Sequence, residues 1–152
     1  MRANRSIFIP LLIVMIFCLH PMSVLPLIQG GKYAAAGLKD ADAEQFFKAL
    51  QQAIDKRDKP AVASMISYPI VVIINGKRQS IKNDVSMIKN YDYVFDKRLS
   101  EFLVQTKIEE LWARDQGVAT PGGEIWFSGV NKDAQHLDKY EIKIIAINGI
   151  KH

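Results

Sequence analysis

Apolar residues form one long run at the start of the chain and recur at regular spacings in the rest of it. Arg2 and Arg5 precede the run, which extends from Ile7 to Leu19 and is interrupted only by Pro10. A positively charged start followed by an apolar segment of this kind is typical of a secretory signal peptide. We therefore expect an exported protein that is periplasmic or secreted.

The end of this leader sets the start of the folded part. The small residues Ala34–Ala36 match a signal-peptidase motif. We expect cleavage after them, which divides the chain into a signal peptide, 1–36, and a single domain, 37–152. Two alternatives remain open: an earlier cut near Ser23, and an uncleaved anchor. The anchor is considered because residues 7–28 approach the ~20 residues that a membrane-spanning helix needs.

Helical periodicity beyond the leader predicts two helices and, after a segment without this periodicity, a third helix. The first helix follows an N-cap at Asp42, and a short second helix begins at Asp58, with Pro60 early in it. The third helix is capped by Asn83, and its pattern resumes at Leu99, so another turn or a second helix follows. The apolar stripes are Ala43, Phe47, Leu50 and Ile54 in the first helix and Val85, Ile88, Tyr91 and Phe95 in the third.

Strands are predicted between the second and third helices and throughout the last third of the chain. The β-branched run Ile70–Ile74 precedes Asn75-Gly76, a strong hairpin signal, and the polar return strand Lys77–Ile81 is typical of a sheet edge. Further strands are expected over residues 111–114, 117–119 (in the same ladder beyond a bulge), 124–130 and 140–148, with a turn over residues 120–123. The final strand carries isoleucines on both faces, which is typical of a central or doubly covered strand.

This order of elements predicts an α+β domain. A curved antiparallel sheet would wrap around the N-terminal helices and bury the stripes of Phe47 and Tyr91 together.

Charge and composition exclude several classes of function. Three of the 20 Lys and Arg residues lie in the expected leader, whereas all 16 Asp and Glu follow it, so the domain has a net charge of about +1. It lacks the basic stripe with interleaved aromatics that nucleic acid binding requires. Cys18, in the leader, is the only cysteine, and the domain has only His136 and His152 as histidines. We therefore expect no metal site and no cofactor.

Four large rings with polar tips are the candidate ligand-binding residues: Tyr68, Tyr91, Trp112 and Trp126. Such side chains suit a largely apolar pocket that contains few oriented donors. The alternative is that they pack in the core with each polar tip bonded to a neighbour.

Asp92, on the predicted third helix, is the candidate catalytic residue. Partial burial would raise its pKa and allow it to act as a general base. The alternative is that it pairs with a cation, Lys89 or Arg98, or is solvated. Glu124, after the glycine turn, is a second candidate of the same kind, with solvent exposure as its alternative.

Several short motifs resemble those of the NTF2-like (cystatin-like) superfamily, in particular its exported, uncharacterised bacterial members. They are Tyr68-Pro69, Tyr91-Asp92, Val94-Phe95, Gly117 and the stretch from Gly122 to Phe127, and the resemblance covers about residues 41–148. It implies a cone in which the space between helix and sheet holds a small apolar ligand. Members similar to ketosteroid isomerase use an acidic base in that cone, whereas Asp92 lies on a predicted helix.

These observations predict a non-enzymatic binding module of the cell envelope, whose partner is a small apolar ligand or an envelope protein. A specific form is an immunity or inhibitor protein that acts on a toxin or hydrolase. The alternative is a lyase or isomerase that uses Asp92 and a tyrosine, and a third hypothesis is a subunit of a larger envelope assembly. A homodimer is left open, and membrane contact is expected only if the leader is retained.

Overall fold

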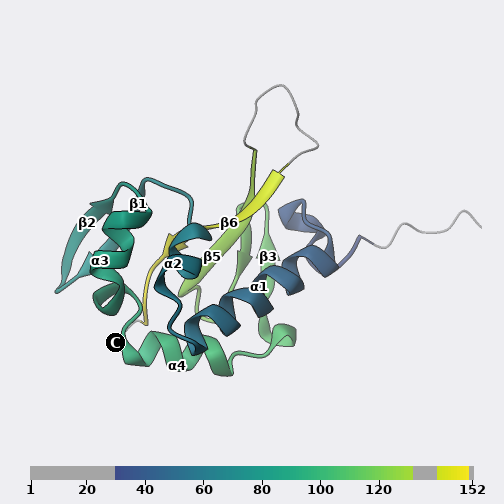
Figure 1. The fold of residues 1–152 in the computed structure, drawn as a ribbon. Coiled ribbons are helices and arrows are strands. Elements are labelled where there is room, and N and C mark those ends of the chain that lie inside the picture. Colours follow the sequence, from purple (N-terminus) through teal and green to yellow (C-terminus); the bar gives the residue numbers. More distant parts are fainter. Residues whose placement is uncertain (1–29, 132–139, 151–152) are drawn as a thin grey trace, which may run out of the picture.

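The computed structural model describes residues 30–131 and 140–150, which form an α+β fold (Figure 1). Helices packed with antiparallel strands confirm that the domain is α+β, as the sequence predicts. The helical elements are η1 (Ala34–Ala36), α1 (Asp40–Asp55), α2 (Lys59–Ser64), α3 (Asp84–Val94), α4 (Lys97–Gln105) and η2 (Ile108–Glu110). The strands are β1 (Ile70–Ile74), β2 (Lys77–Ile81), β3 (Trp112–Arg114), β4 (Gly117–Ala119), β5 (Ile125–Asn131) and β6 (Tyr140–Ile147).

The strands form a hairpin, β1–β2, and a four-stranded antiparallel sheet in the order β3-β4-β5-β6. A short parallel bridge joins the chain before β1 to β6. The backbone N–H of Ser67 donates to the carbonyl of Ile144 (2.9 Å), and the N–H of Ile144 donates to the carbonyl of Met65 (2.8 Å). Strand β6, the last strand of the four-stranded sheet, therefore has a second neighbour among the described residues at Ile144 only.

Helix α1 passes across the four-stranded sheet (Figure 1). The ring of Phe47 stacks on that of Phe127 in β5 with 6.2 Å between centroids, and Phe46 contacts the same ring at 5.0 Å. Phe47 and Phe127 are fully buried. The aromatic side chains of α1 thus pack directly on β5 of the sheet.

Three local signals in the sequence act as predicted. Asn75 and Gly76 both have positive φ (51° and 73°), as a tight hairpin turn between β1 and β2 requires. The Asp58 side chain caps α2 by accepting the N–H of Ala61 (3.0 Å). The Asn83 side chain caps α3 in the same way.

Other expectations for the helices were wrong. Helix α1 begins at Asp40 without a side-chain cap, so Asp42 is not its N-cap. Val85, expected on the apolar face of α3, is 57% exposed, and Met87 is buried in its place. In contrast, the second helix expected as one alternative after Phe95 is confirmed: it is α4, which the Asp96 side chain caps.

The strands of the last third also differ in two details. No bulge separates β3 from β4: they form a hairpin in which Arg114 pairs with Gly117. A bulge occurs in β6 instead, because Trp126 pairs with Ala146 while Phe127 pairs with Ile144. The extra residue breaks the alternation, so that Ile144 and Ile147 are both buried.

Some expectations concern residues outside the described ranges. The apolar run and His136 both lie there, so export remains a prediction. Among residues 30–131 and 140–150, none of the helices is long and apolar enough to cross a membrane. The segment before Gly37, assigned to the leader above, includes the fully buried side chain of Tyr33.

We predict that Phe127→Ala lowers the free energy of unfolding by about 3–5 kcal/mol, because it removes the ring on which α1 packs. Tyr93→Ala, at a side chain that is 62% exposed, serves as the control and should change stability by less than about 0.5 kcal/mol. Urea denaturation measures both. Equal losses in the two variants would show that α1 is not anchored on β5.

Candidate functional site

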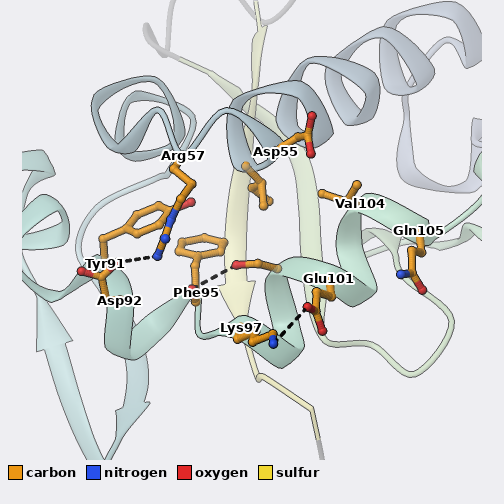
Figure 2. A pocket seen from close by; sticks show the side chains of 11 residues that line it. Asp55, Arg57, Tyr91, Asp92, Phe95, Lys97, Glu101, Val104 and Gln105 are labelled. Carbon is orange, nitrogen blue, oxygen red and sulfur yellow. Dashed lines mark hydrogen bonds and ion pairs between the residues drawn. The ribbon is translucent and has the colours of Figure 1, made fainter.

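A cleft of about 420 Å³ opens between the C-terminal end of α1, the end of α3 and the side of α4 (Figure 2). This volume lies in the range of small-molecule sites. Its apolar lining consists of Ile54, Tyr91, Phe95 and Val104, and its polar lining of Asp55, Arg57, Asp92, Lys97, Ser100, Glu101 and Gln105. Figure 2 shows Arg57, Tyr91 and Asp92 gathered at one end of the cleft, with Glu101, Val104 and Gln105 at the other.

Tyr91 forms the wall at the first end and is only 2% exposed. Its ring stacks on Phe95 with 5.1 Å between centroids. Its hydroxyl is buried and has no hydrogen-bond partner among the described residues. Burial raises the pKa of Tyr91, so the phenol keeps its proton at neutral pH. One residue of the cleft lining therefore carries a buried hydroxyl with no hydrogen-bond partner among the described residues.

Arg57 lies at the mouth of the cleft in an unusual backbone conformation. Its φ is 53°, the left-handed region in which a helix C-terminus usually has glycine. The N–H of Arg57 donates to the carbonyl of Ile54 and that of Asp58 to Ala53, the bonds of a Schellman motif. The Arg57 side chain points toward Asp92 at the same end of the cleft, and its guanidinium lies 3.6 Å from the Asp92 carboxylate.

Asp92 is an ion-paired surface carboxylate. Lys59 donates to it at 2.7 Å, and its side chain is 59% exposed. Its cations are Arg57, between α1 and α2, and Lys59, the first residue of α2, whereas sequence proximity suggested Lys89 or Arg98. The hydrogen bond from Lys59 and the nearby positive charges lower the pKa of Asp92, which is the opposite of the direction that a general base needs.

The other predicted site residues lie outside the cleft lining. The Tyr68 hydroxyl donates to the carbonyl of Ala63 (2.9 Å), and burial raises the pKa of Tyr68 to about 12. Trp112 in β3 and Trp126 in β5 both pair with Ala119 of the intervening strand β4. Their rings therefore meet and form an edge-to-face pair with 4.9 Å between centroids. The Trp112 indole donates to the carbonyl of Thr120 (2.9 Å). The polar groups of Tyr68 and Trp112 are therefore hydrogen-bonded to nearby carbonyls, as expected if these rings are packing residues and not ligand-binding ones.

Glu124 stabilises a turn. Its carboxylate accepts the hydroxyl of Thr120 (2.7 Å) and the backbone N–H of Gly122 (3.1 Å). The N–H of Gly123 donates to the carbonyl of Thr120, which closes the predicted turn between β4 and β5.

Sequence reasoning thus found Tyr91 and Asp92 but missed Arg57. Arg57 lies in the polar run from Asp55 to Lys59, which reads as an ordinary solvated connection. The one signal in the sequence is that neither glycine nor asparagine follows the first helix, although one of them usually occupies the left-handed position at a helix end. Within residues 30–131 and 140–150, no cluster of His, Cys, Asp and Glu suits a metal ion.

Comparisons with protein-family models, with curated proteins and with solved structures found no match to this chain.

We predict that Arg57→Gly stabilises the fold by about 0.5–1 kcal/mol, because glycine adopts the left-handed conformation without steric cost. Arg57→Ala is the matched control, since it removes the guanidinium but keeps the strained backbone. Thermal and urea unfolding of the two variants separate these effects. If alanine stabilised as much as glycine, backbone strain at this position would be refuted.

We also predict that Lys59→Met raises the pKa of Asp92, because it removes the hydrogen bond and charge that stabilise the carboxylate. In the native chain this pKa is lowered on folding, so the ion pair stabilises the folded state at pH values above the pKa of the carboxyl in the unfolded chain. The contribution is lost as the pH falls through the folded-state value. Carboxyl-carbon NMR titration of Asp92 measures the change, with Lys89→Met as control. An unchanged titration in Lys59→Met contradicts the assigned partner.

Proposed function

We propose that this protein is an exported binding module of the cell envelope, which holds a small and largely apolar ligand in the cleft between α1, α3 and α4. The observation that carries the proposal is the buried hydroxyl of Tyr91 beside that cleft, without a partner among the described residues. Buried polar groups in native proteins are nearly always hydrogen-bonded, and an exception calls for an explanation. An acceptor on a bound ligand provides one.

The lining indicates the chemistry of this ligand. Phe95, Ile54 and Val104 offer an apolar surface, while Tyr91 and Arg57 place two hydrogen-bond donors at one end. Asp92 is already bonded to Lys59 at 2.7 Å, and its 3.6 Å contact with Arg57 is longer than a charge-assisted hydrogen bond. Arg57 therefore retains donors for a ligand. We propose a ligand with an apolar body and a terminal oxygen acceptor.

We further propose that the domain is NTF2-like. Two helices, a hairpin, more helix and an antiparallel meander follow in the order of that superfamily, and α1 lies across the sheet. The proposed site differs from the cone interior that the resemblance implied, because its lining comes from α1, α3 and α4 and includes no residue of the sheet, while Phe47 and Phe127 stack between α1 and β5. The cleft lies at the helical end of the molecule instead.

Binding is favoured over the alternative of a lyase or isomerase. Tyr91 and Asp92 do line one cleft, as that alternative requires. However, the ion pairs of Asp92 lower its pKa, and its exposure keeps it in water, so it is a weak base near neutral pH. A protein partner of the immunity or inhibitor type would use a larger surface than this cleft.

The test uses two neutral fluorescent naphthalene probes: prodan, which has a ketone acceptor, and N-phenyl-1-naphthylamine, which lacks an oxygen. We predict that Tyr91→Phe weakens prodan binding about three- to tenfold, which corresponds to the free energy of one hydrogen bond. The affinity for the amine probe should stay the same. Fluorescence titration measures both affinities. Equal effects on the two probes would remove the role of the hydroxyl.

A second pair of variants tests the position of the site. Val104 lines the cleft and Ile145 lies on β6, outside its lining, yet both side chains are 37% exposed. We expect Val104→Asp to weaken both probes and Ile145→Asp to leave them unchanged. If neither probe binds the native chain, or if both variants behave alike, the cleft is not a ligand site.

A further inference from the structure

We propose that the segment Lys32–Ala36 is a permanent part of the folded domain, and that processing of the exported chain leaves it in place. The leader would then end before Gly31, and not at the small-residue motif Ala34–Ala36 that the sequence favours. This inference is independent of the cleft and of its ligand.

Tyr33 is the first reason. Its side chain is 0% exposed and is among the largest fully buried side chains of the described residues. The hydroxyl donates to the carbonyl of Ile108, 75 positions along the chain, at 3.2 Å. Burial, supported by nearby carboxylates, raises the pKa of Tyr33 to about 12. A side chain with this environment belongs to the core and not to a disposable leader.

The backbone and charges around Tyr33 form a second set of contacts. The Asp40 carboxylate, at the start of α1, accepts the N–H groups of Lys32 (2.9 Å) and Tyr33 (3.0 Å). The Lys32 ammonium donates to the carbonyls of Ile108 (3.1 Å) and Glu109 (2.9 Å) in η2. The segment is therefore fastened to α1 on one side and to η2 on the other.

Gly31 and Gly37 lie on either side of this segment, at positions where the backbone is close to Asp40 or forms a turn. A Cβ at Gly31 would lie 2.5 Å from an Asp40 carboxylate oxygen, so a larger residue there would displace the carboxylate that accepts the N–H groups of Lys32 and Tyr33. Gly37 has a φ of 69°, and its N–H donates to the carbonyl of Ala34 (3.0 Å), which closes the turn of η1. The peptide bond after Ala36 therefore lies inside a hydrogen-bonded turn, between two elements that pack in the domain.

A cut at that bond would remove Tyr33 from the core and leave the Asp40 carboxylate without its two backbone donors. Loss of a buried aromatic side chain alone corresponds to a decrease of roughly 10 °C or more in the melting temperature of a domain of this size. A chain that begins at Gly37 would thus retain the sequence of every strand and long helix and still be severely destabilised.

The first experiment expresses the full chain in a Gram-negative bacterium and determines the intact mass and N-terminal residue of the protein in the envelope fraction. A first residue at or before Gly31, including an intact leader, supports the proposal. A folded product that starts at Gly37 overturns it. Circular dichroism establishes whether that product is folded.

The second experiment does not depend on export. It compares the melting temperatures of chains that begin at Gly30 and at Gly37, since residues from Gly30 onward contain the described core. We expect the shorter chain to melt roughly 10 °C lower or to be unfolded. Melting within about 2 °C of the longer chain would overturn the proposal. Within the longer chain, Tyr33→Ala should reproduce most of the loss, while Ala35→Ser, at an exposed position, should not.

Discussion

The stacking of Phe47 on Phe127 is the contact on which the rest of the structure depends. It fixes the middle of α1 on the sheet, so both ends of the helix have defined positions. At the first end, Asp40 meets the backbone of Lys32 and Tyr33. At the other end, Ile54 and the residues after it meet α3 and α4 and form the cleft. One helix therefore connects the N-terminal segment with the candidate site.

Two features of the cleft oppose stability. Arg57 occupies a left-handed position that glycine would occupy with less strain, and Tyr91 buries a hydroxyl that phenylalanine would not carry. Either substitution would be simple if folding were the only requirement. Locally unfavourable features concentrate at functional sites, where the surrounding structure maintains them. Their presence at the same end of one cleft is a stronger indication of function than either would be alone.

Sequence reasoning succeeded where the determining contacts are local. The Asn75-Gly76 turn and the cap at Asp58 depend on residues within three positions. It failed where partners are distant in the chain, as for Tyr33 and the η2 carbonyls, or where a bulge breaks alternation, as at Ile145. At the candidate site it found Tyr91 and Asp92 through their side-chain chemistry, whereas Arg57 matters through a backbone angle that composition does not encode. Tyr68, Trp112 and Trp126 have the same chemistry as Tyr91 but lie elsewhere in the fold.

The location of the cleft follows from the size of the side chains between α1 and the sheet. Phe47 stacks on Phe127 between α1 and β5, and both rings are fully buried, so the middle of this interface is close-packed. The cleft opens where the ends of α1 and α3 diverge beside α4, and water reaches the polar groups there. Asp92 lies at such an end, exposed and paired with Lys59, and these surroundings stabilise its charged form. The same geometry that leaves space for a ligand therefore removes the desolvation that would turn this carboxylate into a base.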